Sequence, residues 1–228
     1  MPSGLRWLAL EVESLERAKR FYTTTFDLAV ESESDEEVVL DVGPSNLVLR
    51  RPRSVPRGGL HTHYAFSTPV DELDAWRDRL GDSFDLVEHQ FGSYTSLYLF
   101  DPDGHCVELG GIDESGSGLT DIFEVVLEVE SLDDAEAFYR ELGYEPVDRG
   151  SERRRVRLDA GSFDLELWEP QLGLADARGG VHVDLGVTVD DPAGIADRLV
   201  DRACRVERLD DGHRIRDRDG HFLTLLAR

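Results

Sequence analysis

Residues 96–111, SLYLFDPDGHCVELGG, predict a strand, a tight turn and a second strand. The tetrapeptide at 101–104, DPDG, supplies a proline with a fixed φ and a glycine that tolerates the left-handed conformation of many reverse turns. After the turn, Glu108 alternates with Val107 and Leu109. This period of two places Glu108 on one face of the strand and the two apolar side chains on the other.

A second copy of this phrase lies near the C-terminus, at residues 215–227, IRDRDGHFLTLLA. Both copies contain Asp-x-Asp-Gly-His, but Thr224 occupies the position that Glu108 holds in the first copy. One copy of the motif therefore carries a carboxylate that the other lacks. We interpret this difference as the strongest functional indication in the sequence.

The whole chain repeats with a period of about 117 residues, which indicates a duplicated architecture. The segment VESL at 12–15 returns at 129–132, and Phe21-Tyr22 returns as Phe138-Tyr139. The duplication implies that the two halves share one fold.

The duplication predicts two domains, residues 1–112 and 120–228. Residues 113–119 are expected to link them, because the surrounding stretch GIDESGSGLT is rich in glycine and serine.

Each half divides again into two βαβββ modules, as judged by alternating strand patterns and amphipathic helix patterns. Ser14 and Ser131 are expected N-caps of the first helix in each half. Thr68 and Asp191, each followed by proline, are expected N-caps of the second helices. The predicted fold class is α+β, with four βαβββ modules whose mixed sheets curl into cups.

Composition excludes several classes of function. The net charge of −23 argues against a nucleic-acid partner. No apolar run is long enough to span a membrane, and the N-terminus lacks the features of a signal peptide, which favours a cytoplasmic location. Cys106 and Cys204 are too few for a disulfide framework, and both are expected to be small core or cavity-lining residues.

The acidic surface carries a further hypothesis. Lys19 is the only lysine among 25 basic residues, and acidic residues occur in every segment. Such a composition suits a cytoplasm with very high salt, where charge repulsion is screened. We therefore expect a halophilic protein that unfolds at low salt.

The four modules, the segments SLERAKRFY at 14–22 and DPDGHCVEL at 101–109, and the Gly-Gly pair at 58–59 resemble the vicinal oxygen chelate superfamily. This superfamily includes glyoxalase I, methylmalonyl-CoA epimerase, extradiol dioxygenases and the fosfomycin and bleomycin resistance proteins. The resemblance implies that paired modules form a cup around a divalent metal. It places one ligand on the first strand of each module and one on the last strand.

These ligand positions can be transferred by register with the repeated motifs. They fall on Trp7 and Val48 in module one, His63 and Glu108 in module two, Glu124 and Glu166 in module three, and Asp184 and Thr224 in module four. Only pairing of modules two and three gives a complete ligand set. Glyoxalase I enzymes are known for this crossed pairing, and modules one and four would then form a degenerate cup.

The resemblance to glyoxalase I implies a lyase or isomerase that removes a proton next to a metal-polarised carbonyl. By position, Glu108 and Glu166 correspond to that family's glutamates and are candidates for the base, while His63 would be a fixed ligand. One imidazole and three carboxylates suit Mn(II), Fe(II), Ni(II), Zn(II) or Mg(II). Glu124 departs from the family, which has His or Gln there, and this puts the identity of the substrate in doubt.

Two other functions stay open. An extradiol dioxygenase needs two histidines and one carboxylate, so His61 or another histidine would have to join His63. A metal-free protein that binds small molecules, of the resistance type, would use the cup without catalysis. In every case the partner is a small molecule and the protein a monomer or homodimer. The basic run of Arg50, Arg51, Arg53 and Arg57 is expected to be a solvated loop, with contact to an anionic substrate as the alternative.

Overall fold

The computed structural model describes residues 4–52, 62–170 and 183–228. These residues form two curled eight-stranded sheets flanked by four α-helices and one short 3₁₀ helix. This confirms the predicted α+β class. His61 and the glycine pair at 58–59 lie outside the described residues. No helix in the described ranges is long and apolar enough to cross a membrane.

The first half of the chain contains two βαβββ modules. Module one consists of β1 (Gly4–Glu11), α1 (Leu15–Thr25), β2 (Ala29–Glu33), β3 (Glu37–Val42) and β4 (Ser45–Arg50). Module two consists of β5 (Thr62–Pro69), η1 (Val70–Glu72), α2 (Leu73–Gly81), β6 (Val87–Phe91), β7 (Tyr94–Phe100) and β8 (Cys106–Asp113).

The second half repeats this order. Module three consists of β9 (Asp121–Glu128), α3 (Leu132–Arg140), β10 (Glu145–Arg149), β11 (Arg155–Asp159) and β12 (Asp164–Trp168). Module four consists of β13 (Val183–Val189), α4 (Pro192–Leu199), β14 (Arg205–Arg208), β15 (Gly212–Arg216) and β16 (Phe222–Ala227).

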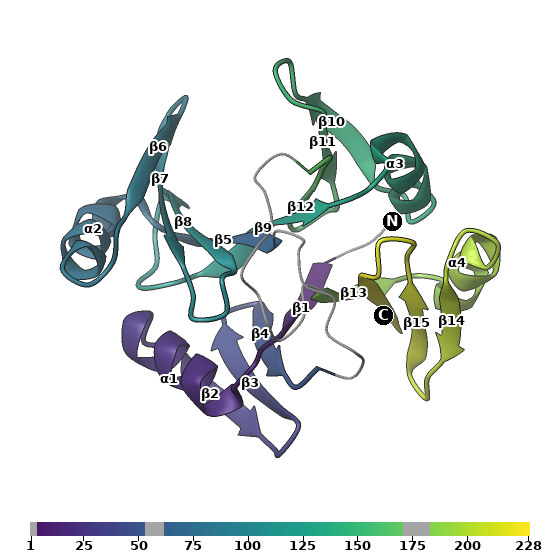
Figure 1. Cartoon of the computed structure of the whole chain (residues 1–228), viewed down its shortest axis with the longest axis horizontal. Helices are drawn as coiled ribbons and strands as arrows, with labels where there is room; N and C mark the ends of the chain where they lie inside the picture. Colours follow the sequence, from purple (N-terminus) through teal and green to yellow (C-terminus); the bar gives the residue numbers. More distant parts are fainter. Residues whose placement is uncertain (1–3, 53–61, 171–182) are drawn as a thin grey trace.

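Each sheet combines one module from each half of the chain. One sheet has the order β14-β15-β16-β13-β1-β4-β3-β2, and the other has β10-β11-β12-β9-β5-β8-β7-β6. The halves join through antiparallel pairs, β1 with β13 and β5 with β9. This is the crossed pairing under which the ligand set is complete. We call the two concave faces cup 1–4 and cup 2–3, after their modules (Figure 1).

This pairing bears on the domain boundaries predicted from the repeat. The expected linker, 113–119, connects β8 to β9, which lie in the same sheet. The division at 1–112 and 120–228 describes the duplication and stays a prediction as a statement about independent domains.

The helices pack on the faces of the sheets opposite the cups. α1 and α2 lie side by side at one flank, and α3 and α4 at the other (Figure 1). Tyr64 and Phe66 on β5 belong to the buried apolar core, and the Phe66 ring lies 5.6 Å from that of Phe26 at the end of α1. Alternation along β5 therefore turns His63 toward the cup.

Side-chain caps begin three of the four α-helices as expected. Ser14 accepts a hydrogen bond from the Arg17 backbone N–H at 3.4 Å, and Ser131 and Asp191 make the equivalent contacts with Asp134 and Gly194. These contacts satisfy backbone donors that have no partner inside the helix.

The N-cap assigned to Thr68 is wrong. Thr68 lies in β5, and its hydroxyl donates to the Gly118 carbonyl at 2.8 Å and accepts from Trp76 Nε1 at 3.0 Å. Pro69 precedes the 3₁₀ helix η1, and α2 begins after Glu72, which makes no side-chain capping hydrogen bond. Tertiary partners inside the core have taken the hydroxyl that would otherwise have capped the helix.

The repeated Asp-x-Asp-Gly-His motif connects the last strand of a module to the first helix of each half. Asp101 accepts hydrogen bonds from the His105 backbone N–H at 2.8 Å and the Tyr22 hydroxyl at 2.7 Å. Gly104 has a φ of 85°, in the left-handed region that favours glycine. In the second copy, Asp217 accepts from the His221 N–H and the Tyr139 hydroxyl. The motif is therefore a structural turn.

Candidate metal centre

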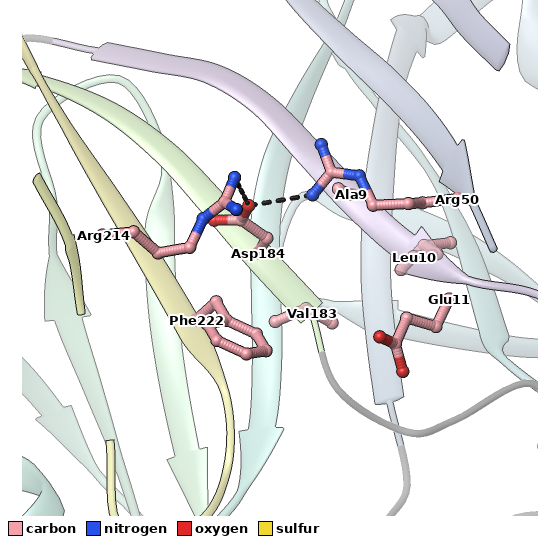
Figure 2. Close-up of a pocket in the computed structure, with 8 residues that line it drawn as sticks. All are labelled: Ala9, Leu10, Glu11, Arg50, Val183, Asp184, Arg214 and Phe222. Atoms are coloured by element: carbon pink, nitrogen blue, oxygen red, sulfur yellow. Dashed lines mark hydrogen bonds and ion pairs between the residues drawn. The ribbon is translucent and has the colours of Figure 1, made fainter. Parts of the chain in front are cut away.

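Cup 1–4 contains the degenerate set of ligand positions, and none of these residues forms a group of metal ligands there. Asp184 accepts a hydrogen bond from Arg50 at 2.9 Å (Figure 2). Its other carboxylate oxygen accepts one from the Thr224 hydroxyl at 2.7 Å. The Trp7 ring packs over Gly186, where an added Cβ would lie 2.2 Å from the indole. Within the described ranges, groups of three potential metal ligands occur in cup 2–3 alone.

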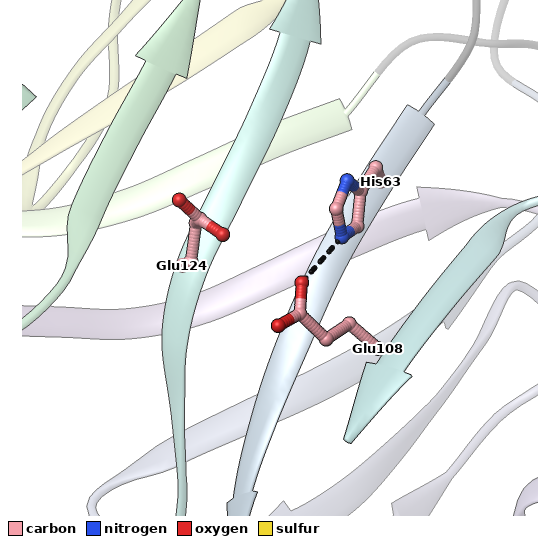
Figure 3. Close-up of side chains that lie close together, drawn as sticks. All are labelled: His63, Glu108 and Glu124. Carbon is pink, nitrogen blue, oxygen red and sulfur yellow. Dashed lines mark hydrogen bonds and ion pairs between the residues drawn. The ribbon is translucent and has the colours of Figure 1, made fainter. Parts of the chain in front are cut away.

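Cup 2–3 brings together three of the four predicted metal ligands, as Figure 3 shows. His63 comes from β5, Glu108 from β8 and Glu124 from β9. β5 lies between the other two strands, and its Ala65 is paired in register with both glutamates. One ligand atom from each residue lies within 4.8 Å of the others, and all three residues are buried.

His63 and Glu108 are in direct contact. His63 Nε2 lies 2.8 Å from Glu108 Oε2. Burial alone would raise the pKa of the Glu108 carboxyl, but its interactions with His63, Ser96 and Tyr98 together outweigh burial, and the pKa is lowered. Glu108 is therefore ionised at neutral pH, as a metal ligand must be.

Glu124 is the more strongly perturbed carboxyl. Burial raises its pKa to about 7, despite the opposing charge of Arg157, and the negative charges of Glu108 and Glu166 add to this effect. Arg157 Nη2 lies 2.7 Å from Glu124 Oε1. This contact is an ion pair that lacks hydrogen-bond geometry. Glu124 Oε1 is therefore a buried oxygen without a hydrogen bond, and a metal cation could bind it.

Glu166, the fourth predicted ligand, is not in the three-residue group. It is buried on β12, where Arg155 and the indole N–H of Trp168 hold its two oxygens. Arg157 Nε lies 3.7 Å from Glu166 Oε1, so one guanidinium spans the gap between Glu166 and Glu124. Glu166 borders the candidate ligands without joining them.

Arg155 and Arg157 are cup residues that are not among the site residues predicted from the sequence. They alternate on β11 with the core residues Val156 and Leu158. That alternation was the available signal, since it places both arginines on the cup face of the sheet.

The side chains present fit a divalent cation. An imidazole nitrogen and two carboxylates are donors that first-row divalent metals accept. Three protein ligands leave further coordination positions for water or substrate oxygens. The unsatisfied geometry at Glu124 is consistent with a site that is completed by a cation.

The comparison with protein families agrees with this geometry. Residues 4–109 match the family described as the Glyoxalase/Bleomycin resistance protein/Dioxygenase superfamily. The first half of the chain belongs to this superfamily. The match covers modules one and two and therefore includes His63 and Glu108.

Known proteins resemble this chain in sequence over about half of its length and in fold over its whole length. The chain is 28% identical to the metallothiol transferase FosB of Bacillus licheniformis over 113 residues, which are 46% of this chain and 73% of the relative. FosB of Staphylococcus saprophyticus is 26% identical over 116 residues, 48% of this chain and 77% of that protein. The fold of the whole chain matches glyoxalase I from Zea mays with a TM-score of 0.67, at 18% identity, over 100% of this chain and 92% of that chain.

Proposed function

We propose that the protein is a divalent-metal-dependent enzyme that acts on a small oxygen-bearing substrate in cup 2–3. His63, Glu108 and Glu124 would hold the metal. The observation that supports this most is the convergence of three buried ligand atoms within 4.8 Å on three adjacent strands. A bound divalent metal supplies Lewis-acid polarisation of a substrate oxygen.

The preferred reaction is a glyoxalase-like lyase or isomerase reaction, in which a proton is removed next to a carbonyl. Glu108 belongs to the ligand group, whereas Glu166 lies outside it. We therefore assign proton abstraction to Glu166. Arg155 and Trp168 hold its carboxylate in a fixed orientation beside Glu124.

The second candidate is metal-dependent transfer of a thiol. The similarity to the two metallothiol transferases favours this candidate, because the aligned part of the chain covers about three quarters of each relative. Such a reaction needs a metal to activate the acceptor but does not need Glu166 as a base.

Two other functions, extradiol dioxygenase and metal-free binding protein, are distinguished by the assays described below. An extradiol dioxygenase would need a second histidine, but His63 is the only histidine in the described ligand group. A metal-free binding protein would show no turnover in any assay. We carry these as alternatives to the isomerase.

Three assays on metal-loaded protein separate these reactions. They are conversion of 2-oxoaldehyde–thiol adducts, thiol consumption in the presence of fosfomycin, and oxygen consumption with catechols. We expect turnover in the first assay, with loss of turnover but retention of metal in Glu166→Gln. Activity confined to the second or third assay would replace the isomerase proposal, and a fully active Glu166→Gln would remove the assigned base.

A further inference from the structure

Two arginines meet at one carboxylate in cup 1–4. Arg50 Nη1 on β4 and Arg214 Nη2 on β15 lie 2.9 and 3.0 Å from the same oxygen of Asp184 (Figure 2). The other Asp184 oxygen accepts from the Thr224 hydroxyl at 2.7 Å. Asp184 is buried and its oxygens are occupied, so it is a poor metal ligand. Arg50, Arg214 and Asp184 thus form a fixed clamp, in which each arginine keeps N–H donors that Asp184 does not use.

Arg50 corrects an expectation from the sequence. The sequence predicts a solvated basic loop that includes Arg50 and Arg51, but Arg50 ends β4 and its side chain is only 11% exposed. Its Nε donates to Glu37 at 2.9 Å, which fixes the plane of the guanidinium. Arg214 Nε donates to Thr224 at 3.1 Å and is fixed in the same way.

Each guanidinium has five N–H donors, and the contacts just described use two of them on each arginine. Both side chains line a cleft with about 320 Å³ of empty space, part of it open to solvent. Ala9 and Phe222 contribute to the wall of this cleft. The remaining donors therefore border a shallow cleft that opens to solvent and can admit only a small ligand.

Two further donors in the cup have no acceptor within the described part of the chain. They are Trp7 Nε1 and Arg216 Nε, both buried atoms. A buried donor without a partner is destabilising. Arg216 follows Arg214 on the same face of β15, and its guanidinium lies 6.0 Å from the Phe222 ring. The cup is thus rich in donors, which favours a ligand that accepts hydrogen bonds.

The charges in the cup disfavour a ligand with more than one negative charge. Arg50, Arg214 and Arg216 face Asp184, Glu37 and Glu11, so the cup has no surplus of positive charge. Asp184 neutralises one of the two clamp arginines, Arg50 and Arg214. Glu37 pairs with Arg50 from a partly exposed position, and Glu11 lies at the margin of the cleft. A second negative charge on the ligand would be repelled by Glu11. The chain's net charge of −23 also disfavours unspecific adsorption of anions.

We propose that cup 1–4 binds a small monocarboxylate. Arg50 and Arg214 receive its carboxylate through their unused N–H groups, and its hydrocarbon part rests against Phe222. Planar guanidinium donors match the two oxygens of a carboxylate, and charge assistance makes these hydrogen bonds strong. The duplicated fold would then hold a cation site in one cup and an anion site in the other.

The test uses butyrate as the probe, with butyramide as its uncharged counterpart and succinate as the dianion. Thermal unfolding and titration calorimetry are carried out at constant ionic strength on the full chain. Butyrate is expected to raise the unfolding midpoint and to bind with a stoichiometry of one. Butyramide and succinate should bind at least tenfold more weakly. Equal stabilisation by butyramide, or no butyrate binding, would overturn the proposal.

Three variants locate the site. Arg214→Gln should lose butyrate binding at least tenfold, and His63→Ala, altered in cup 2–3, should bind as the wild type does. Arg50→Lys keeps the charge but removes the forked donor, so it tests the geometry if Arg214→Gln fails to fold. Binding that survives both arginine changes, or that is lost in His63→Ala, would contradict a site in cup 1–4. If the wild type does not bind butyrate and the arginine variants are merely less stable, the ion pairs of Arg50 and Arg214 with Asp184 have a purely structural role.

Discussion

His63 and Glu108 lie 45 residues apart in the sequence and touch across adjacent strands, with 2.8 Å between the imidazole Nε2 and the carboxylate Oε2. Parallel pairing of β5 with β8 brings them together, and antiparallel pairing of β5 with β9 adds Glu124 from the other half of the chain. The candidate site therefore depends on the crossed assembly of the two halves.

Glu108→Gln should weaken metal retention at least tenfold while leaving the fold intact. The amide keeps the shape of the side chain and a hydrogen-bonding partner for His63, but it removes the charge that binds the cation. The measurement is titration of metal-free protein with Mn(II) and Zn(II). Asp184→Asn is the matched control in cup 1–4. It should lower stability, because Arg50 and Arg214 lose their shared carboxylate, but it should leave metal affinity unchanged. The opposite pattern would move the metal site to cup 1–4.

Arg157→Gln should raise the affinity for a divalent cation by about tenfold, which corresponds to about 1.4 kcal/mol. The guanidinium lies 2.7 Å from Glu124 and competes with a cation for that carboxylate. The same change should destabilise the metal-free protein to urea, because Glu124 loses its only ion-pair partner among the described residues.

Arg155→Gln is the control for this prediction. Arg155 pairs with Glu166 and Asp148 and makes no ion pair with Glu124 in the described structure. Its removal should change metal affinity less than removal of Arg157. Lower affinity in Arg157→Gln would show that the arginine supports the cation site instead of competing with it.

The buried pair of Asp101 and His105 should make stability depend on pH at both ends of the range. Burial disfavours the charged imidazole, but the charge of Asp101 outweighs it and raises the pKa of His105. Burial likewise opposes ionisation of Asp101, but His105 lowers the pKa of this carboxyl. The stabilising effect of the imidazolium is complete below its unfolded pKa of about 6.5 and is lost as pH rises through the raised folded value.

The contribution of Asp101 has the opposite sign. It is present above the unfolded pKa of about 3.9 and is lost as pH falls through the lowered folded value. Between about pH 3.9 and pH 6.5, the pair should therefore make its largest contribution to the free energy of unfolding, which urea unfolding of the wild type measures. In His105→Gln the decline above about pH 6.5 should disappear. An unchanged decline would assign the alkaline limit to other groups.

Salt should stabilise the chain strongly. A net charge of −23 creates self-repulsion that counterions screen over about 10 Å at 0.1 M salt. We expect the urea midpoint, followed by circular dichroism, to rise steeply with KCl and the protein to unfold on dialysis to low salt. A midpoint that is independent of KCl would contradict the halophilic hypothesis.

The modules could be predicted from the sequence because they rest on repeated local patterns, whereas their pairing was inferred from ligand positions that the superfamily resemblance implies. The Asp-x-Asp-Gly-His turn recurs with the same contacts to Tyr22 and Tyr139, and the distribution of candidate ligands indicated the pairing that β5 and β9 make. Local pattern also gave the cup-facing orientation of His63 and Glu108.

Long-range partners were beyond the reach of local pattern. Thr68 does not cap a helix because Trp76 and Gly118 take its hydroxyl. Cys204 is exposed and not a core residue, while Cys106 is buried as expected. The pairing of Glu166 with Arg155 depends on contact between neighbouring strands, which alternation alone does not specify.

Metal content measured by mass spectrometry tests the central claim most directly. Wild type and His63→Ala would be purified in high salt without chelator and then incubated with Mn(II), Fe(II), Ni(II), Zn(II) or Mg(II). We predict about one equivalent of metal per chain in the wild type and loss of that metal in His63→Ala. A wild type that stays metal-free, or a His63→Ala variant that keeps its metal, would contradict a metal centre built from His63, Glu108 and Glu124.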